Sequence, residues 1–445
     1  MAVLTDEQKL MRNSTGLSIA EGLDRIANAI SSRRGIIYGF HIDPNESDPE
    51  DAVTYLLDAV GMTPAAMDYT NGVFNWGSWR DAFFMPRPCM LKYDGTVDYY
   101  LDENDYTKKY TGGASDVADI TYGGNAMMEW GQNGKKIWYK IVPDADPTGA
   151  SIYIADHQAD ANFHAYSFIN NQGVMVDHFY TPIYNGTLDE SGKLRSISGI
   201  AGTSLCKSKT AAQEIAAAEL NNPGTDKLWD TEVYADILVI QLLLTLISKR
   251  LDSNVAFGEG LINSGSEAVN NGFTTGVHND KGLFYGTNSG AAATYTNAVK
   301  VFGMENFWGF QWRRFRGLVN VSGTEKYKLT RGTQDGSTAQ DYVVSTTDAD
   351  YDGYLTGGAL PAASGTYIDK MTFDTKAMTP TAASGNATTN YCDGLWTDNN
   401  QCDYASRGGA SRYGAPCGLW CFGLHRAASF ASWAVGAALS CKPLS

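Results

Sequence analysis

Two cysteines near the C-terminus, Cys417 and Cys421, are close enough in sequence to act together in chemistry. They flank the tripeptide Gly-Leu-Trp, and two neighbouring thiols can bind a soft metal ion or do redox chemistry. In an extended strand, residues four apart face the same side but are too far apart for a disulfide unless the chain bends. The alternative, which we favour, is that both are small apolar residues of a core.

A second group of residues has the types expected of a cation site. Asp348, Asp350 and Asp352, followed by Gly353, reproduce the start of an EF-hand calcium loop. Such a loop needs a bidentate glutamate at its twelfth position, where this chain has Ala359. The segment is therefore predicted to be an acidic turn between strands, and a calcium ion bound there is the less favoured alternative.

Familiar catalytic motifs are missing from the sequence. The six histidines are scattered, none of them in an H-x-x-x-H or H-E-x-x-H pattern, and no G-x-S-x-G, P-loop or G-x-G-x-x-G segment occurs. We therefore expect no catalytic residue, no metal ligand and no cofactor. The seven cysteines are odd in number and dispersed, which argues against a disulfide framework and for synthesis in a reducing cytosol.

The segment from Arg407 to Pro443 scatters unlike residues among apolar ones, and no helix or strand period explains the scatter. Its tyrosine, arginine, histidine and phenylalanine side chains are good anchors in interfaces, while serine and glycine supply adaptable contacts at low entropic cost. Between Ala410 and Ser440 it contains Arg412 and Arg426 but no acidic residue. The segment therefore favours an anionic binding partner.

Composition limits what the rest of the chain can be. Its 445 residues are enough for two or three domains, and 47 glycines with 25 tyrosines indicate many turns and irregular loops. The formal charge of −15 argues against nonspecific nucleic-acid binding. The opening MAVLTDEQKL lacks the features of a secretory signal, and no membrane insertion is expected.

Two helices can be predicted. Near the N-terminus, Ile19, Leu23, Ile26 and Ile30 form one apolar stripe, which must pack on the rest of the chain, on copies of itself or on a docking partner. Residues 226–252 form the strongest helix, and its apolar run is too short to span a bilayer. We read that run as a buried helix.

The remaining elements are mostly strands. Residues 36–64 suggest a strand, an acidic turn and a short helix. Two hairpins are predicted, one turning at Asp94-Gly95 and one at Asn133-Gly134. Residues 320–390 are rich in Thr, Ser, Gly and Asp, with strand-like runs such as QDYVVSTT, and indicate a β-rich insertion or a loop excursion.

Several stretches together resemble a known family. These are DKLWDTEVYADILVIQLL, VFGMENFWGFQWRRFRGLV and RGG…CGLWCFGLHRAASFASWAVGAALS, with YGFHIDPNESDP and RPCMLKYDGTVDYYLDENDYTK near the front. The chain resembles phage receptor-binding proteins with the C-type lectin fold of formylglycine-generating enzymes. Among these it is similar to the variable proteins of diversity-generating retroelements, the group that includes phage tropism determinants. The resemblance covers about residues 36–445.

This resemblance implies a function for the C-terminal scatter. In such proteins a retroelement rewrites adenine-containing codons, and the new residues form a binding surface on a rigid scaffold. The scaffold implied here is Cys417, Trp420, Cys421, Phe422, Leu424, Trp433 and Leu439. The implied exposed, ligand-binding residues are Ala410, Ser411, Arg412, Tyr413, Ala415, Pro416, Gly423, His425, Arg426, Phe430, Ser432 and Ala434.

The resemblance also implies an architecture and a setting. We expect an α+β chain: an N-terminal helical attachment or oligomerisation element (1–35), a mixed α/β and hairpin region (36–146), and an irregular C-type lectin domain (147–445) with a β-rich insertion at about 320–390. The expected protein is a homotrimeric part of a phage virion, in a tail or head fibre, made in the host cytoplasm. It would bind a bacterial surface protein or glycan, and other virion proteins through its N-terminal region.

Two rival functions remain open at this level. One is a structural decoration or collar protein of the virion that binds no receptor. The other is a copper-dependent oxidase of the formylglycine-generating type, with Cys417 and Cys421 as its cysteine pair. Against the oxidase, three residues separate the cysteines where the enzyme pattern has four, and Gly436-Ala-Ala replaces the terminal Gly-Phe-Arg. We therefore expect no enzyme activity.

Overall fold

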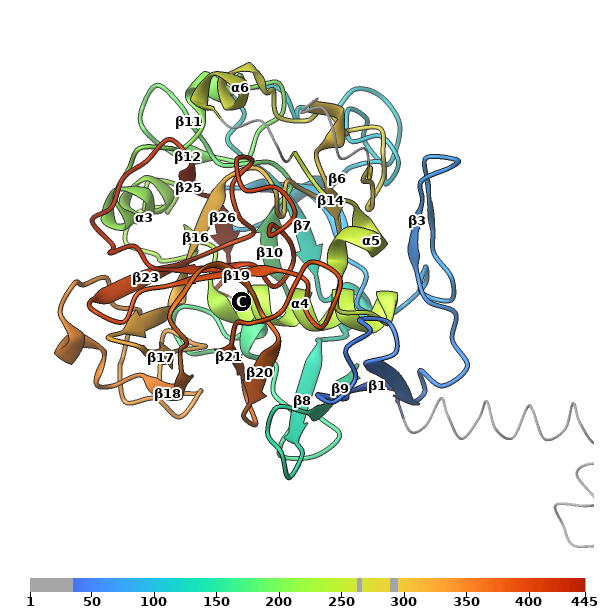
Figure 1. Cartoon of the computed structure of the whole chain (residues 1–445). Helices are drawn as coiled ribbons and strands as arrows, with labels where there is room; N and C mark the ends of the chain where they lie inside the picture. Colours follow the sequence, from blue (N-terminus) through green and yellow to red (C-terminus); the bar gives the residue numbers. More distant parts are fainter. Residues whose placement is uncertain (1–34, 262–265, 289–294, 445) are drawn as a thin grey trace, which may run out of the picture.

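The longest apolar run of the sequence forms helix α4 (Tyr234–Ser248), which lies in the middle of the computed structural model (Figure 1). The structure describes residues 35–261, 266–288 and 295–444, so the predicted N-terminal stripe lies outside the described residues. All fifteen residues of α4 are buried, as expected for a helix that is apolar all round. The helix is shorter than predicted because it ends at Lys249, whose φ is 54°, and because Trp229–Thr231 form strand β13.

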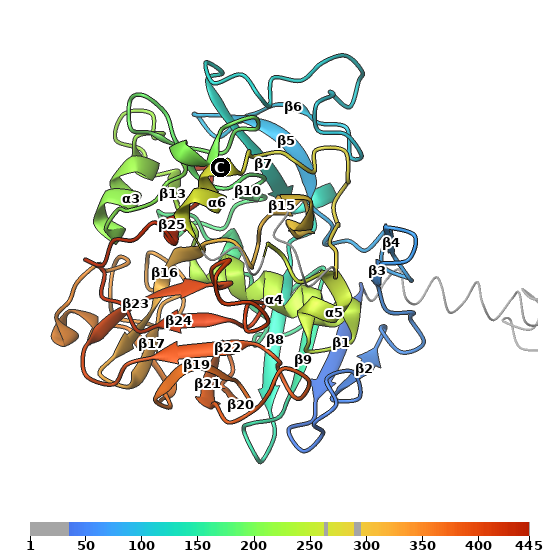
Figure 2. The same cartoon turned by 45° about the horizontal axis from the view of Figure 1, so that its top comes forward.

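Strands lie around α4 in both views (Figures 1 and 2). A four-stranded sheet has the order β2 (Val53–Leu57), β1 (Ile37–Ile42), β9 (Ala150–Ala155) and β8 (Trp138–Pro143). A six-stranded sheet has the order β13, β26 (Leu439–Cys441), β10 (Phe179–Pro182), β7 (Gly124–Trp130), β5 (Arg87–Lys92) and β6 (Val97–Tyr100). The six-stranded sheet thus pairs the last strand of the described chain, β26, with strands from its first half and middle.

The largest sheet carries the C-terminal segment. Its order is β18 (Leu355–Ala359), β17 (Thr324–Tyr327), β16 (Trp312–Val321), β23 (Cys402–Arg407), β24 (Phe422–Leu424), β22 (Gly394–Thr397) and β19 (Ala363–Tyr367), with β25 (Val435–Ala437) beside β16. Strand β16 packs against α4. From α4, the Gln241 side chain donates a hydrogen bond to the Leu419 carbonyl at 2.9 Å. The central helix therefore holds the loop before β24 directly.

Smaller elements complete the described part of the chain. Four two-stranded ribbons are β3 (Ala66–Asp68) with β4 (Val73–Asn75), β11 (Thr187–Leu188) with β12 (Leu194–Arg195), β14 (Lys300–Val301) with β15 (Met304–Glu305), and β20 (Lys370–Phe373) with β21 (Met378–Ala382). The other helices are α3 (Ala211–Glu219), α5 (Ser253–Phe257) and α6 (Glu267–Gly272). None of the described helices is both long and apolar enough to cross a membrane.

The predicted α+β class is wrong. Strands make up 32% of the described residues and helices 13%, and the sheets curl into a half-barrel. The chain is therefore mainly β. The short helix expected near residue 55 is strand β2, where Val53 and Tyr55 are buried and Thr54 is exposed. This alternation, with β-branched and aromatic side chains, favours a strand over a helix.

The two predicted hairpins have different outcomes. The Asp94-Gly95 turn joins β5 to β6 as expected, with Gly95 at a φ of 82°. The Asn133-Gly134 turn also forms, with positive φ at both residues, but the strands beside it do not pair with each other. Strand β7 pairs with β5 and β10, whereas β8 pairs with β9, so the predicted second hairpin is wrong.

The predicted β-rich stretch at 320–390 does contain strands β17 to β21. Within it, the run QDYVVSTT forms no strand. Its backbone is held by tyrosine hydroxyls instead, because Val343 N–H donates to Tyr354 and Ser345 N–H donates to Tyr351. No observation bears on whether the stretch is an insertion or on the other predicted domain boundaries, which stay predictions.

Candidate functional site

Side chains from three parts of the chain gather around a small hollow on the largest sheet. We name this hollow the C-terminal hollow. Its lining residues are Trp312, Arg314, Tyr404, Ser406, Arg412, Tyr413, His425, Arg426, Phe430 and Val435. Five of them belong to the predicted ligand-binding set: Arg412, Tyr413, His425, Arg426 and Phe430. The fold thus brings together the residues with the largest side chains in that set.

The floor of the hollow is aromatic and rigid. The Trp312 ring, at the start of β16, meets Trp396 of β22 edge-on, with ring centroids 5.1 Å apart. Tyr413 packs against both rings, at 5.8 Å from Trp312 and 4.7 Å from Trp396. Such edge-on aromatic pairs add to the stability that burial alone provides. A partner that enters the hollow therefore meets a preformed surface.

Buried ion pairs hold the strands below this floor. Glu232 accepts hydrogen bonds from Arg313 of β16 at 3.0 Å and from Arg407 of β23 at 2.6 Å. Arg314 pairs with Glu214 of α3 at 3.0 Å and also donates to the Phe430 carbonyl. The positive charge of Arg314 is thus paired with a carboxylate inside the protein. At the hollow, Arg314 holds the loop that contains Phe430.

Two other arginines of the hollow have their charged groups at the protein surface. The Arg412 guanidinium lies over the Tyr413 ring at 4.8 Å and donates to the Tyr413 hydroxyl at 2.7 Å. The Arg426 guanidinium lies over Phe430 at 4.8 Å. Both side chains are exposed, and within the described ranges neither forms an ion pair. These cation–π contacts orient the guanidinium groups, and apart from the Arg412 hydrogen bond to Tyr413 their donors are open to a partner.

Two titratable groups sit beside these arginines. Burial and the neighbouring Arg426 lower the pKa of His425 to about 4, so its ring is neutral at pH 7, and its Nδ1 is buried without a hydrogen-bond partner. Burial raises the pKa of Asp403, on β23, to about 7. Asp403 therefore offsets the charge of Arg426 only in part, and the hollow is positive.

The rest of the predicted ligand-binding set falls into two groups. Ala415, Pro416 and Ser432 are exposed or half-buried but do not line the hollow. The predicted exposure of four others is wrong because they are buried, namely Ala410, Ser411, Gly423 and Ala434. Ser411, for example, donates to Asn270 Oδ1 at 3.1 Å. Four of the small residues thus lie beneath the surface, three lie at the surface beside the hollow, and the five large side chains line it.

Sequence reasoning missed the contribution of β16 and β23. Trp312 and Arg314 are two apart on one strand, and Tyr404 and Ser406 are two apart on the next. Residues at this spacing share one face of a strand. Paired aromatic and polar residues at this spacing were the signal that could have found them.

The two cysteines of the predicted pair lie inside the protein. Cys417 and Cys421 are free and buried, and burial raises the pKa of both thiols, which disfavours the reactive thiolate. The predicted scaffold residues are buried apart from the half-buried Trp433. Across the described ranges, no three His, Cys, Asp or Glu residues are placed to hold a metal ion.

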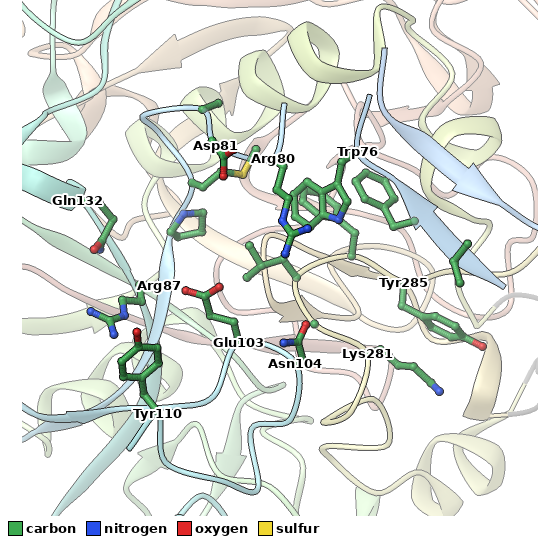
Figure 3. A pocket seen from close by; sticks show the side chains of 18 of the residues that line it. Trp76, Arg80, Asp81, Arg87, Glu103, Asn104, Tyr110, Gln132, Lys281 and Tyr285 are labelled. Carbon is green, nitrogen blue, oxygen red and sulfur yellow. The ribbon is translucent and has the colours of Figure 1, made fainter. Parts of the chain in front are cut away.

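A second and larger concavity is lined by residues that are distant in sequence from those of the C-terminal hollow. This cleft of about 830 Å³ is bounded by the β3–β4 ribbon, the turns at 103–110 and 132–133, and the loop at 280–285. Figure 3 shows Trp76 and Arg80 on one wall, Arg87 and Tyr110 on another, and Glu103 and Asn104 between them. We name it the N-terminal cleft. No residue of the predicted ligand-binding set lines it.

Comparison with known proteins gives limited information. No protein-family model and no curated protein matches the chain. Among solved structures, the chain is similar to the Major Tropism Determinant I1 variant, at 12% identity over 81% of this chain and 72% of that one, with a TM-score of 0.29. For the Major Tropism Determinant M1 variant, the identity is 13% over the same shares and the TM-score is 0.26. Scores this low describe a weak likeness and do not establish a shared fold.

Proposed function

We propose that this chain is the receptor-binding protein of a phage particle and that the C-terminal hollow contacts the host-cell surface. The observation that carries the proposal is the convergence of Arg412, Tyr413, His425, Arg426 and Phe430 on one preformed hollow. Exposed arginine and aromatic side chains on a rigid floor are the chemistry of interface hot spots. The resemblance of the sequence to phage receptor-binding proteins supports the same function.

The charge of the hollow defines the partner. Two exposed arginines without an ion pair in the described residues favour an anionic group, such as an acidic glycan or an acidic loop of a bacterial surface protein. The area of the hollow is small, so a single site would bind weakly. In the proposed virion the chain is a homotrimer attached through residues 1–35, and several copies would strengthen adsorption by avidity.

The test is adsorption of labelled full-length protein to a panel of bacterial strains. The hollow variant combines Arg412→Ala, Tyr413→Ala, His425→Ala, Arg426→Ala and Phe430→Ala. A matched control, Lys108→Ala, Leu220→Ala and Lys370→Ala, also removes two exposed positive charges and an exposed apolar side chain. We expect the native protein and the control to bind a narrow set of strains and the folded hollow variant to bind none.

Two other results would contradict the proposal. If the hollow variant binds as the native protein does, the receptor surface lies elsewhere on the chain. If the native protein binds no strain, the structural role as a decoration or collar becomes the better explanation.

A further inference from the structure

The N-terminal cleft has a rigid aromatic wall. Phe74 of β4 stacks on Phe284 with ring centroids 4.3 Å apart. Trp76 meets both rings edge-on, at 5.1 Å from Phe74 and 5.4 Å from Phe284. The Trp76 ring is half-buried, so one part of it packs into this cluster while another part faces the cleft (Figure 3). The wall thus presents a fixed flat apolar surface to a ligand.

The opposite wall holds a guanidinium group between two tyrosines. Arg87 lies over the Tyr100 ring at 3.7 Å and over the Tyr110 ring at 4.6 Å. Its Nε is buried and has no hydrogen-bond partner, and Tyr110 is 61% exposed. The Arg87 guanidinium holds the largely exposed Tyr110 ring in place on this wall of the cleft.

The N-terminal cleft is lined by equal numbers of basic and acidic side chains. The lining contains three basic residues, Arg80, Arg87 and Lys281, and three acidic residues, Asp81, Glu103 and Asp280. Within the described part of the chain, Arg80, Asp81 and Glu103 form no ion pair, and Arg80 and Glu103 point toward the middle of the cleft from different walls (Figure 3). The cleft therefore offers both charged donors and charged acceptors, without the excess of one sign that a polyanion or polycation would need.

From these features we infer that the N-terminal cleft is a second binding site and that its ligand is a neutral oligosaccharide. A sugar ring has apolar C–H faces, which pack on flat aromatic rings such as Trp76 and Tyr110, and hydroxyl groups that both donate and accept hydrogen bonds. The volume of about 830 Å³ lies within the ~300–1,000 Å³ typical of small-molecule sites. A purely apolar ligand would leave the charged side chains desolvated without partners. This inference does not depend on the proposed function of the C-terminal hollow.

The test uses four defined probes with the full-length protein: cellohexaose, maltohexaose, mannohexaose and chitohexaose. Binding is measured by saturation-transfer NMR and isothermal titration calorimetry, with dextran sulfate as an anionic comparison. The cleft variant is Glu103→Ala with Asn104→Ala, because both side chains are exposed and line the cleft. The matched control is Glu190→Ala with Asn400→Ala, two exposed positions outside the lining. The hollow variant is included as a second control.

We expect at least one neutral probe to bind, and we expect the cleft variant to weaken it by about tenfold or more through the loss of two polar contacts. The two control variants should bind that probe as the native protein does. The inference is overturned if no neutral probe binds, if only dextran sulfate binds, or if the hollow variant and not the cleft variant loses the probe.

Discussion

The C-terminal hollow and the N-terminal cleft use similar side chains, aromatic rings with arginines over them, but differ in volume, charge and support. The hollow has a volume of only about 20 Å³ and is positive, and it rests on strands joined by the buried Glu232 ion pairs. The cleft has a volume of about 830 Å³ and is balanced in charge, and one of its walls is the short β3–β4 ribbon. Similar side chains are thus placed around two concavities of very different size.

The support beneath the hollow gives the largest expected effect. Glu232→Gln would leave the buried Arg313 and Arg407 side chains without their shared carboxylate, and breaking such a buried pair costs about 3–5 kcal/mol. The comparison is Glu103→Gln in the cleft, whose side chain is exposed and whose change should stay within about 0.5 kcal/mol. The free energy of unfolding is measured by urea denaturation. If Glu232→Gln and Glu103→Gln have equal free energies of unfolding, the buried ion pairs do not make the hollow more strongly supported than the cleft.

A pair of glycine substitutions compares how tightly each region is built. Gly409 has a φ of 74°, and a Cβ there would meet the sulfur of buried Cys417, whereas Gly72 has a φ of 66° and open space around it. Gly409→Ala should cost about 2–4 kcal/mol through backbone strain and overpacking. Gly72→Ala should cost only the backbone strain of about 1 kcal/mol. Thermal unfolding of both variants is the measurement, and a reversed order would contradict the structure of the 409–417 loop.

The smallest effect concerns pH. The folded pKa of His425 is about 4, below the unfolded value of about 6.5, so between these values the unfolded chain binds more protons. The stability from the neutral ring is therefore full above about pH 6.5 and is lost as the pH falls toward 4. Relative to His425→Gln, the native protein should lose about 2 kcal/mol more between pH 7 and pH 5, measured by urea denaturation. The cleft lining has no histidine, so oligosaccharide binding there should lack this pH dependence.

How well the fold could be predicted depended on how far apart in the sequence the paired strands are. The Asp94-Gly95 hairpin is local, so its turn chemistry was sufficient. The Asn133-Gly134 turn was recognised correctly, but β7 is buried along its whole length and pairs with strands 30 or more residues away on either side. Likewise Trp229–Thr231, expected in a helix, is a strand because it pairs with β26 at the far end of the chain. Such pairings follow from tertiary packing that no local pattern contains.

The candidate site was predictable to a similar extent. The resemblance pointed to the C-terminal segment, and five of the residues predicted there line one hollow, namely Arg412, Tyr413, His425, Arg426 and Phe430. Which small residues point inward could not be read from the sequence, because Ala and Ser suit both a core and a surface. The contribution of Trp312 also escaped, since it comes from a strand about one hundred residues earlier in the chain. No sequence motif marks the N-terminal cleft, because its walls come from four separate segments.

The state of the cysteines has a practical consequence. All seven are buried and unpaired, and burial raises the pKa of each thiol. Maleimide reagents, which need an accessible thiolate, should therefore leave the folded protein unmodified. A single cysteine introduced at exposed Asn400 would then take one fluorophore per chain, so the number of chains on a particle could be counted by stepwise photobleaching without first removing a native cysteine.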